Sequence, residues 1–99
     1  MLNINKTIEN GKAAFSLEGR LDTTTAPDLE KAFKDTLDGV NELTLDFSSL
    51  DYISSAGLRV LLSAQKLMNQ QGEMKITHVN EIVMEIFDVT GFSNILAIE

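Results

Sequence analysis

Two adjacent serines, Ser54 and Ser55, lie where an alternating strand pattern gives way to a helical one. The first residues of a helix have backbone N–H groups without partners inside the helix, and a serine hydroxyl there can bond them. A phosphate on such a hydroxyl would meet the same N–H groups and the positive end of the helix dipole. The pair is therefore a candidate phosphorylation switch, with two ordinary capping serines as the simpler alternative.

A second candidate is Asp22, which ends the segment Gly19-Arg20-Leu21-Asp22. An aspartate at such a position is by itself a common turn former. In an open α/β sheet, however, functional loops gather at the carboxyl ends of the strands. Because the strands before Asp22 and before Ser54 both end there, we expect Asp22 beside the serine loop. The small residues Ala56 and Gly57 leave that loop open to an approaching protein.

Catalytic and metal chemistry have little support in the sequence. Asp22, Asp46 and Asp51 follow no known ligand spacing, so we expect no bound metal. His78 is the only histidine and no Gly-x-Ser-x-Gly elbow is present, so no catalytic triad is predicted. A glycine-rich phosphate loop and a dinucleotide fingerprint are also missing. We expect a protein that is not an enzyme and needs no cofactor.

Composition narrows the classes of partner. The 99 residues suffice for one small domain with a single core. The net charge of −7 argues against nucleic acid and anionic membranes as partners. It favours a partner with a basic docking face, although an ordinary acidic solvated surface explains the charge at least as well. The absence of cysteine excludes disulfides and thiolate zinc sites, as suits a reducing compartment. No apolar run could cross a bilayer, and Met1 to Glu9 indicate a strand rather than a signal peptide, so we expect a cytoplasmic protein.

The hydrophobic pattern predicts an α/β fold with a mostly parallel mixed sheet, an N-terminal hairpin and helices packed on the sheet. Asn10-Gly11 is the strongest short hairpin signal, because both residues tolerate positive φ. A threonine before Pro27 is expected to cap the first helix. The predicted order is β-β-α-β-α-β-α-β. The strands are expected near 2–9 and 13–17 and over 43–47, 74–77 and 94–98. The helices are expected from Pro27 to Leu37, over 55–71, and between a cap at Asn80 and an end at Gly91.

Three stretches together resemble the STAS domain family, and within it the bacterial anti-anti-sigma factors, also called anti-sigma factor antagonists. The three match in order and spacing over nearly the whole chain, which predicts a single STAS domain over residues 1–99. They are Gly19-Arg20-Leu21-Asp22, Tyr52-Ile53-Ser54-Ser55-Ala56-Gly57-Leu58 and Ile86-Phe87-Asp88-Val89-Thr90-Gly91-Phe92.

The resemblance implies a partner-switching function. In that family, the serine two residues before the glycine of this loop is phosphorylated by the partner, an anti-sigma factor and serine-protein kinase with a histidine-kinase-like ATPase fold. By that match Ser55 is the acceptor, the kinase holds ATP and Mg²⁺, and a phosphoserine phosphatase resets the switch. The unphosphorylated protein, expected to be a monomer, would bind the kinase and release a sigma factor. The expected partner-binding residues are Asp22, Thr23, Ser54, Ser55, Ala56, Gly57, Leu58 and Arg59.

The chain departs from the family pattern at two places. Family members often have aspartate just before the acceptor, where this chain has Ser54, so Ser54 stays open as an alternative acceptor. Many also carry a fourth helix after the last strand, which we expect to be absent or a stub here, because the sequence ends at Glu99. The alternative function is a phospho-regulated STAS interaction module that controls a non-sigma target, such as a secretion or signalling regulator.

Overall fold

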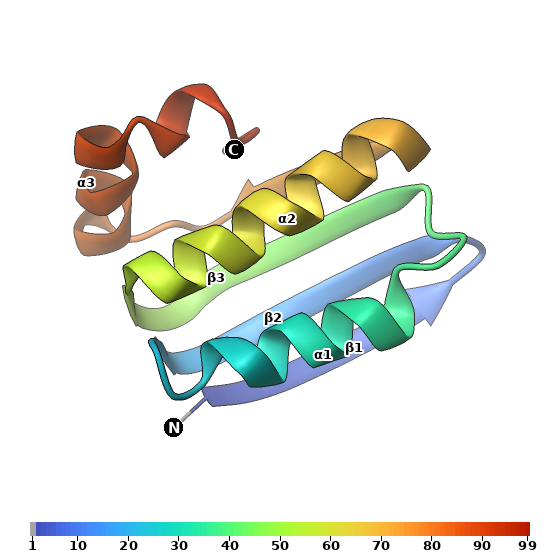
Figure 1. The fold of residues 1–99 in the computed structure, drawn as a ribbon, viewed down its shortest axis with the longest axis horizontal. Coiled ribbons are helices and arrows are strands. Elements are labelled where there is room, and N and C mark those ends of the chain that lie inside the picture. The colour runs from blue at the N-terminus through green and yellow to red at the C-terminus, as the bar shows by residue number, and fades with distance from the viewer. Residues whose placement is uncertain (1) are drawn as a thin grey trace.

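The computed structural model describes residues 2–99, which follow the predicted order as far as the third helix (Figure 1). A short 3-10 turn then takes the place expected for a last strand. The elements are β1 (Leu2–Glu9), β2 (Lys12–Leu21), α1 (Ala26–Thr36), β3 (Glu42–Ile53), α2 (Ser55–Gln71), β4 (Glu73–Thr77), α3 (Glu81–Thr90) and the 3-10 turn Phe92–Asn94.

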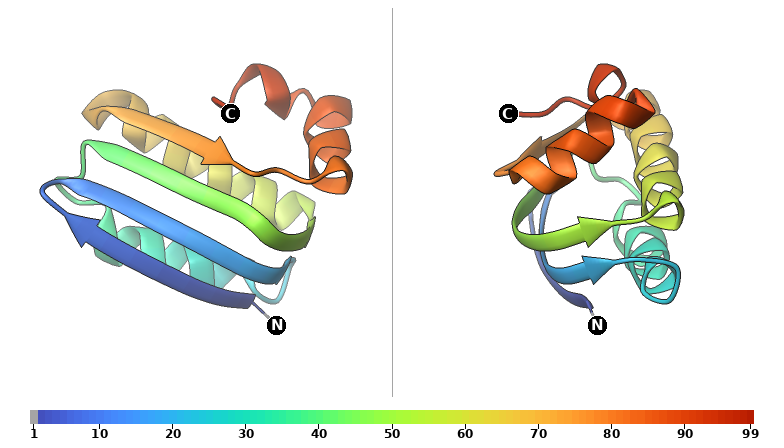
Figure 2. Two further views of the ribbon diagram at one scale, coloured as in Figure 1. Left: turned by 180° about the vertical axis from the view of Figure 1, so that it is seen from behind. Right: turned by 90° about the vertical axis from the view of Figure 1, so that its left-hand side faces the viewer.

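The four strands form one sheet in the order β1-β2-β3-β4. β1 pairs antiparallel with β2, whereas β2 with β3 and β3 with β4 are parallel. Figure 1 shows α1 and α2 side by side on one face of the sheet, and Figure 2 shows that, in the described part of the chain, no helix covers the opposite face. α3 lies beside the carboxyl end of β4. The carboxyl ends of β2, β3 and β4 therefore share one edge with the starts of α1 and α2.

The hairpin between β1 and β2 has the geometry that its sequence predicts. Asn10 has φ 52° and Gly11 has φ 80°, so both turn residues lie in the left-handed region. A two-residue turn of this kind matches the twist of the strands that it joins. The hairpin thereby sets the register of β1 on β2, from Leu2 opposite Gly19 to Glu9 opposite Lys12.

The core lies between the sheet and the helices. The rings of Phe15 on β2 and Phe33 on α1 meet edge to face, with centroids 5.1 Å apart. Phe47 on β3 and Phe87 on α3 lie 6.4 Å apart, which joins α3 to the same core. Burying one such side chain contributes on the order of 2–3 kcal/mol. The largest fully buried side chains are Phe15, Phe47, Phe87, Leu17, Leu21, Leu29, Leu37, Leu43, Leu45, Leu50, Ile53 and Leu61.

The predicted strand over 94–98 is wrong. The chain leaves α3 at Gly91 with φ 82° and enters the 3-10 turn, which uses the residues up to Asn94. Only the last residues reach β4, where Ile98 forms a single parallel bridge with Ile76. The Ile76 N–H donates to Ala97 and its carbonyl accepts from the Glu99 N–H. The N–H groups of Ile95 and Leu96 both bond the Phe92 carbonyl within the turn instead of β4, so no strand ladder forms over 94–98.

Gly72 ends α2 because another part of the backbone passes close to it. Its φ of 167° is an extended conformation that any residue adopts. A Cβ atom here would overlap the carbonyl group of Asn41, whose oxygen accepts a hydrogen bond from the Glu73 N–H at 3.1 Å. The close approach lets β4 begin directly after the helix.

We predict that Gly72→Ala lowers the free energy of unfolding by about 3 kcal/mol, because the methyl group displaces the Asn41 carbonyl. Gly39→Ala is the matched control, since a Cβ there has no neighbour within 4 Å but φ is +80°. Gly39→Ala should lower the free energy of unfolding only by the strain of placing alanine in the left-handed region, about 1–2 kcal/mol. Urea denaturation measures both losses, and an equal or smaller loss for Gly72→Ala would contradict the role of the close approach.

Candidate functional site

Ser54 joins the end of β3 to the start of α2. Its backbone N–H donates to the carbonyl of Leu21 at 2.9 Å, which ties the loop to the last residue of β2. Its Oγ accepts from the Gly57 N–H at 3.4 Å, and its carbonyl accepts from Leu58 at 2.9 Å. The half-buried Ser54 is therefore the N-cap of α2, as its residue type favours.

Ser55 differs from Ser54 although the two are neighbours. It is the first residue of α2, and its side chain is exposed to solvent. Within residues 2–99 its hydroxyl makes no hydrogen bond to another protein group. A reactant can therefore reach Ser55 Oγ without breaking the cap that Ser54 provides.

Gly57 holds the first turn of α2 against the sheet. It is buried, and a Cβ atom here would lie 2.7 Å from Leu21 Cγ and 2.9 Å from Ile53 Cγ1. Leu58, next in the chain, is only 5% exposed and belongs to the core. Of the expected partner-binding residues, these two thus support the loop from inside and present little surface.

Asp22 lies at the same edge of the sheet, where its carboxylate orders the loop before α1. Its Oδ1 accepts from the Thr24 N–H at 3.0 Å, the Thr24 hydroxyl at 2.8 Å and the Thr25 N–H at 3.2 Å. Thr25 is at the N-cap position of α1, as expected, but its side chain makes no capping hydrogen bond, because its hydroxyl donates to the Arg20 carbonyl at 2.8 Å instead. The hydroxyl oxygen of Thr25 also accepts a hydrogen bond from the Asp22 N–H at 2.9 Å.

The hydrogen bonds around Asp22 also fix its charge. The hydroxyl of Thr24, followed by the N–H groups of Thr25 and Thr24, lowers the pKa of this carboxyl, and partial desolvation opposes the shift. Arg20 lies beside it, with Nε 3.8 Å from Asp22 Oδ2 and Cζ 4.6 Å from the centroid of the Tyr52 ring. Asp22 is therefore an anion near neutral pH. Thr24, which lowers the pKa of Asp22, is not among the site residues predicted from the sequence. The run of three threonines that follows Asp22 is the feature that could have indicated it.

The starts of α1 and α2 enclose a shallow hollow of about 180 Å³. Thr23 lies on one side of it, and Ala56 and Arg59 lie on the other. The exposed Arg59 is one helical turn after Ser55, so both residues lie on the same side of α2. Thr23, Ser55, Ala56 and Arg59 thus belong to one surface.

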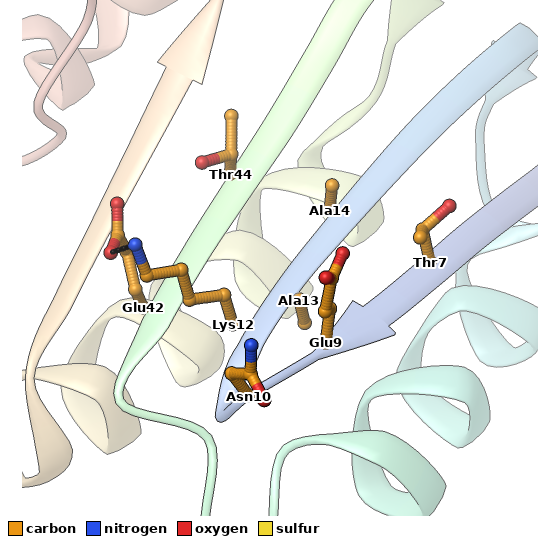
Figure 3. A pocket seen from close by; sticks show the side chains of 8 residues that line it. All are labelled: Thr7, Glu9, Asn10, Lys12, Ala13, Ala14, Glu42 and Thr44. Atoms are coloured by element: carbon orange, nitrogen blue, oxygen red, sulfur yellow. Dashed lines mark ion pairs between the residues drawn. The ribbon is translucent and has the colours of Figure 1, made fainter.

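A larger hollow of about 450 Å³ lies at the other end of the sheet (Figure 3). Its side chains come from the end of β1, the β1–β2 turn and the starts of β2 and β3, far along the strands from Ser55. Lys12 and Glu42 form an ion pair across it, with Nζ 3.6 Å from Oε2. Its polar side chains are exposed or only partly buried.

The remaining candidate residues do not join the serine loop. His78 follows β4, and its Nδ1 lies 3.4 Å from Asp46 Oδ1. The pKa of Asp46 is lowered, chiefly because its carboxylate accepts a hydrogen bond from the Ser48 N–H. Among residues 2–99, no three acidic or histidine side chains come together in a way that could hold a metal ion. In the same part of the chain, no helix is long and apolar enough to span a membrane.

A mixed four-stranded sheet with a serine at the start of the helix after β3 defines an α/β domain with a loop site at the carboxyl edge. This chain belongs to the STAS domain family, whose sequence model matches residues 3–99. It is 37% identical over 91 residues to BtrV of Bordetella bronchiseptica, which is named as a candidate anti-sigma factor antagonist. That alignment covers 90% of this chain and 78% of BtrV.

Two further comparisons agree with this assignment. The anti-sigma-B factor antagonist of Staphylococcus aureus strain NCTC 8325 is 27% identical over 97 residues, which cover 96% of this chain and 90% of that protein. The crystal structure of an anti-sigma factor antagonist from Mycobacterium paratuberculosis superposes with a TM-score of 0.88 at 20% identity, covering 99% of this chain and 85% of that one. The structural likeness shows that the STAS fold is shared.

We predict that the two serines differ in their effect on stability. Ser54→Ala should lower the free energy of unfolding by about 0.5–1 kcal/mol, because it removes the cap of α2. Ser55→Ala should change it by less than about 0.5 kcal/mol, because an exposed hydroxyl without a partner is lost. Urea denaturation of both variants checks this, and equal losses would contradict the assignment of Ser54 as the cap.

We predict that the Thr24 hydroxyl helps to keep Asp22 ionised. In an NMR titration the pKa of Asp22 should lie below its ordinary range, and Thr24→Val should raise it. Because the folded pKa is lowered, the stability that this carboxylate contributes is present above the unfolded pKa and is lost as pH falls through the folded one. Thr23→Val is the control, since Thr23 makes no hydrogen bond to Asp22. Equal pKa values in the two variants would refute the assigned cause.

Proposed function

We propose that the protein is a cytoplasmic anti-sigma factor antagonist that is switched by phosphorylation of Ser55. In its unphosphorylated form it binds an anti-sigma factor that is also a serine-protein kinase, and the sigma factor is released. The observation that carries this proposal is the exposed Ser55 hydroxyl at the start of α2, on one surface with Thr23 and Arg59. The names of the relatives from Bordetella bronchiseptica and Staphylococcus aureus support the class of partner.

Geometry favours Ser55 over Ser54 as the acceptor. The Oγ of Ser54 is engaged with the Gly57 N–H, whereas the Oγ of Ser55 is free and faces solvent. In the transfer, the bond from the γ-phosphorus of ATP to its bridging oxygen breaks and a bond to Ser55 Oγ forms. ADP leaves, and the hydroxyl proton passes to a base of the kinase, which also holds Mg²⁺. A phosphatase later hydrolyses the phosphoserine and returns the hydroxyl.

The fold should tolerate this modification. A phosphate adds about −1.5 to −2 charges at pH 7, and at the start of α2 it meets the positive end of the helix dipole. Arg59, four residues further along α2, can pair with it in the free protein. Charge is thus added without loss of any core contact.

Binding should respond strongly to the same charge. In the complex the phosphate would be shielded from water near Asp22, whose carboxylate is already anionic. An unpaired charge buried at an interface costs several kcal/mol, roughly a hundredfold or more in affinity. Electrostatic repulsion and desolvation therefore suffice to separate the partners without refolding.

We predict that the host's purified anti-sigma kinase, given Mg²⁺ and ATP, places one phosphate on Ser55. Ser55→Ala should accept none yet bind the kinase like the unmodified protein, and Ser55→Glu should bind at least about tenfold more weakly. Ser54→Ala is the matched control and should still be phosphorylated. Mass spectrometry with fragment-ion mapping of the tryptic peptide Asp35 to Arg59 locates the phosphate.

Two results would change the proposal. Phosphate on Ser54, or stoichiometric phosphate on Ser55→Ala, would refute Ser55 as the acceptor. An anti-sigma kinase that neither binds nor modifies the protein would favour the alternative, a STAS module that acts on a non-sigma target.

A further inference from the structure

A groove runs between α1 and α2 on the helix-covered face of the sheet, where Figure 1 shows the two helices side by side. Its volume is about 250 Å³, and most of the side chains that line it are apolar. We call it the interhelical groove. Its lining includes Glu30, Phe33 and Lys34 on α1, and Val60, Ser63, Ala64 and Leu67 on α2.

The interhelical groove exists because large and small side chains face each other across it. Phe33 is fixed from below by its edge-to-face contact with Phe15. On α2 the facing positions include Ser63 and Ala64, which are too small to fill the space beside it. Leu67 forms part of the wall and is a large apolar side chain that stays 39% exposed. The floor is thus preformed and apolar, as a docking site for apolar side chains requires.

The groove is continuous with the surface around Ser55. Glu30 and Val60 line both the interhelical groove and the hollow at the starts of α1 and α2. The other side chains of that hollow include Thr23 and Arg59. A partner that contacts the serine loop therefore reaches the groove without crossing an intervening ridge.

We propose that the interhelical groove receives an amphipathic helix of the anti-sigma factor; this inference rests on the proposed function. Eleven positions separate Ala56 at the serine loop from Leu67. At about 1.5 Å per residue the surface is roughly 16 Å long, which matches about three turns of a partner helix. Such a helix would place apolar side chains at helical spacing into the groove. Basic residues on its flank suit the net charge of −7 of this chain. At the rim itself Glu30 is already paired with Lys34, whose Nζ lies 3.9 Å from Glu30 Oε1.

A second copy of this chain is a less suitable occupant. The helix it could offer is α3, where Ile82 is 60% exposed and Val89 is 77% exposed. Docking α3 of one copy into the groove of the next is a head-to-tail contact, which leads to rings or open filaments rather than a closed pair. We therefore assign the groove to a partner helix.

The proposal assigns separate tasks to the two parts of the surface. The groove supplies affinity in both phosphorylation states, and Ser55 supplies the switch. Variants of the groove should raise the KM of the kinase for this protein and leave kcat near its original value at saturation, because the interaction they remove is not specific to the transition state.

The test compares an exposed apolar residue in the groove with one outside it. Leu67→Glu and Ile82→Glu each place a glutamate at an exposed apolar position of a helix. The Kd for the host's purified anti-sigma kinase, without ATP, is measured by calorimetry. Leu67→Glu should weaken binding by about tenfold or more, and Ile82→Glu by less than about twofold.

A second pair obstructs the groove without removing an apolar residue. Ser63 is exposed on α2, so Ser63→Arg fills the groove from a surface position. Ala14→Arg adds the same side chain on the uncovered face of the sheet (Figure 3). Only Ser63→Arg should weaken binding and raise KM. Circular dichroism and thermal unfolding verify that all four variants fold.

The outcomes separate the two proposals. If the unmodified protein binds the kinase and all four variants bind equally well, the groove proposal fails and the proposed function stands. If Ile82→Glu weakens binding and Leu67→Glu does not, the partner helix lies on α3 and the groove proposal is overturned. If the unmodified protein does not bind an anti-sigma kinase, the proposed function fails and the groove proposal fails with it. Self-association that Leu67→Glu abolishes would assign the groove to a second copy.

Discussion

The parallel pairing of β2 with β3 is the constraint on which the site depends. It sets Leu21 opposite Ile53, so the two strands end together and the Ser54 N–H reaches the Leu21 carbonyl. That hydrogen bond fixes where α2 begins, and with it the position of Ser55. The loop that holds Asp22 leaves from the same strand end. Two loops that are separated by two elements of the chain, α1 and β3, thereby form one surface.

Around this edge, rigid parts and accessible parts are kept distinct. Gly57 and Leu58 face inward, and the space that Gly57 leaves is filled by Leu21 and Ile53. Ser55 and Arg59 face outward from the same turn of α2. A charge added on the outside therefore changes the surface potential without disturbing the core. This division suits the switch that we propose, in which phosphorylation of Ser55 alters binding without refolding.

Much of the fold could be predicted because its signals are local. Asn10 and Gly11 adopt the positive φ angles that their residue types favour, Asn80 caps α3 with a 2.8 Å bond from the Val83 N–H, and α2 spans the predicted 55–71. The prediction failed at the C-terminus. Leu96 and Ile98 alternate with other residues as in a strand, but the N–H groups of Ile95 and Leu96 bond the Phe92 carbonyl within the 3-10 turn, so only the last residues lie along β4.

The sequence by itself determined the residues of the site and their chemistry: two serines at a helix start, an aspartate in a neighbouring loop, and a net charge of −7. These follow from propensities that act within a few residues. Only the tertiary structure decided that Ser54 caps α2 while Ser55 is exposed, directed the Thr25 hydroxyl to the Arg20 carbonyl, and opened a groove beside Phe33. Those outcomes depend on which backbone groups and side chains from distant parts of the chain come into contact. The local sequence pattern does not predict such contacts.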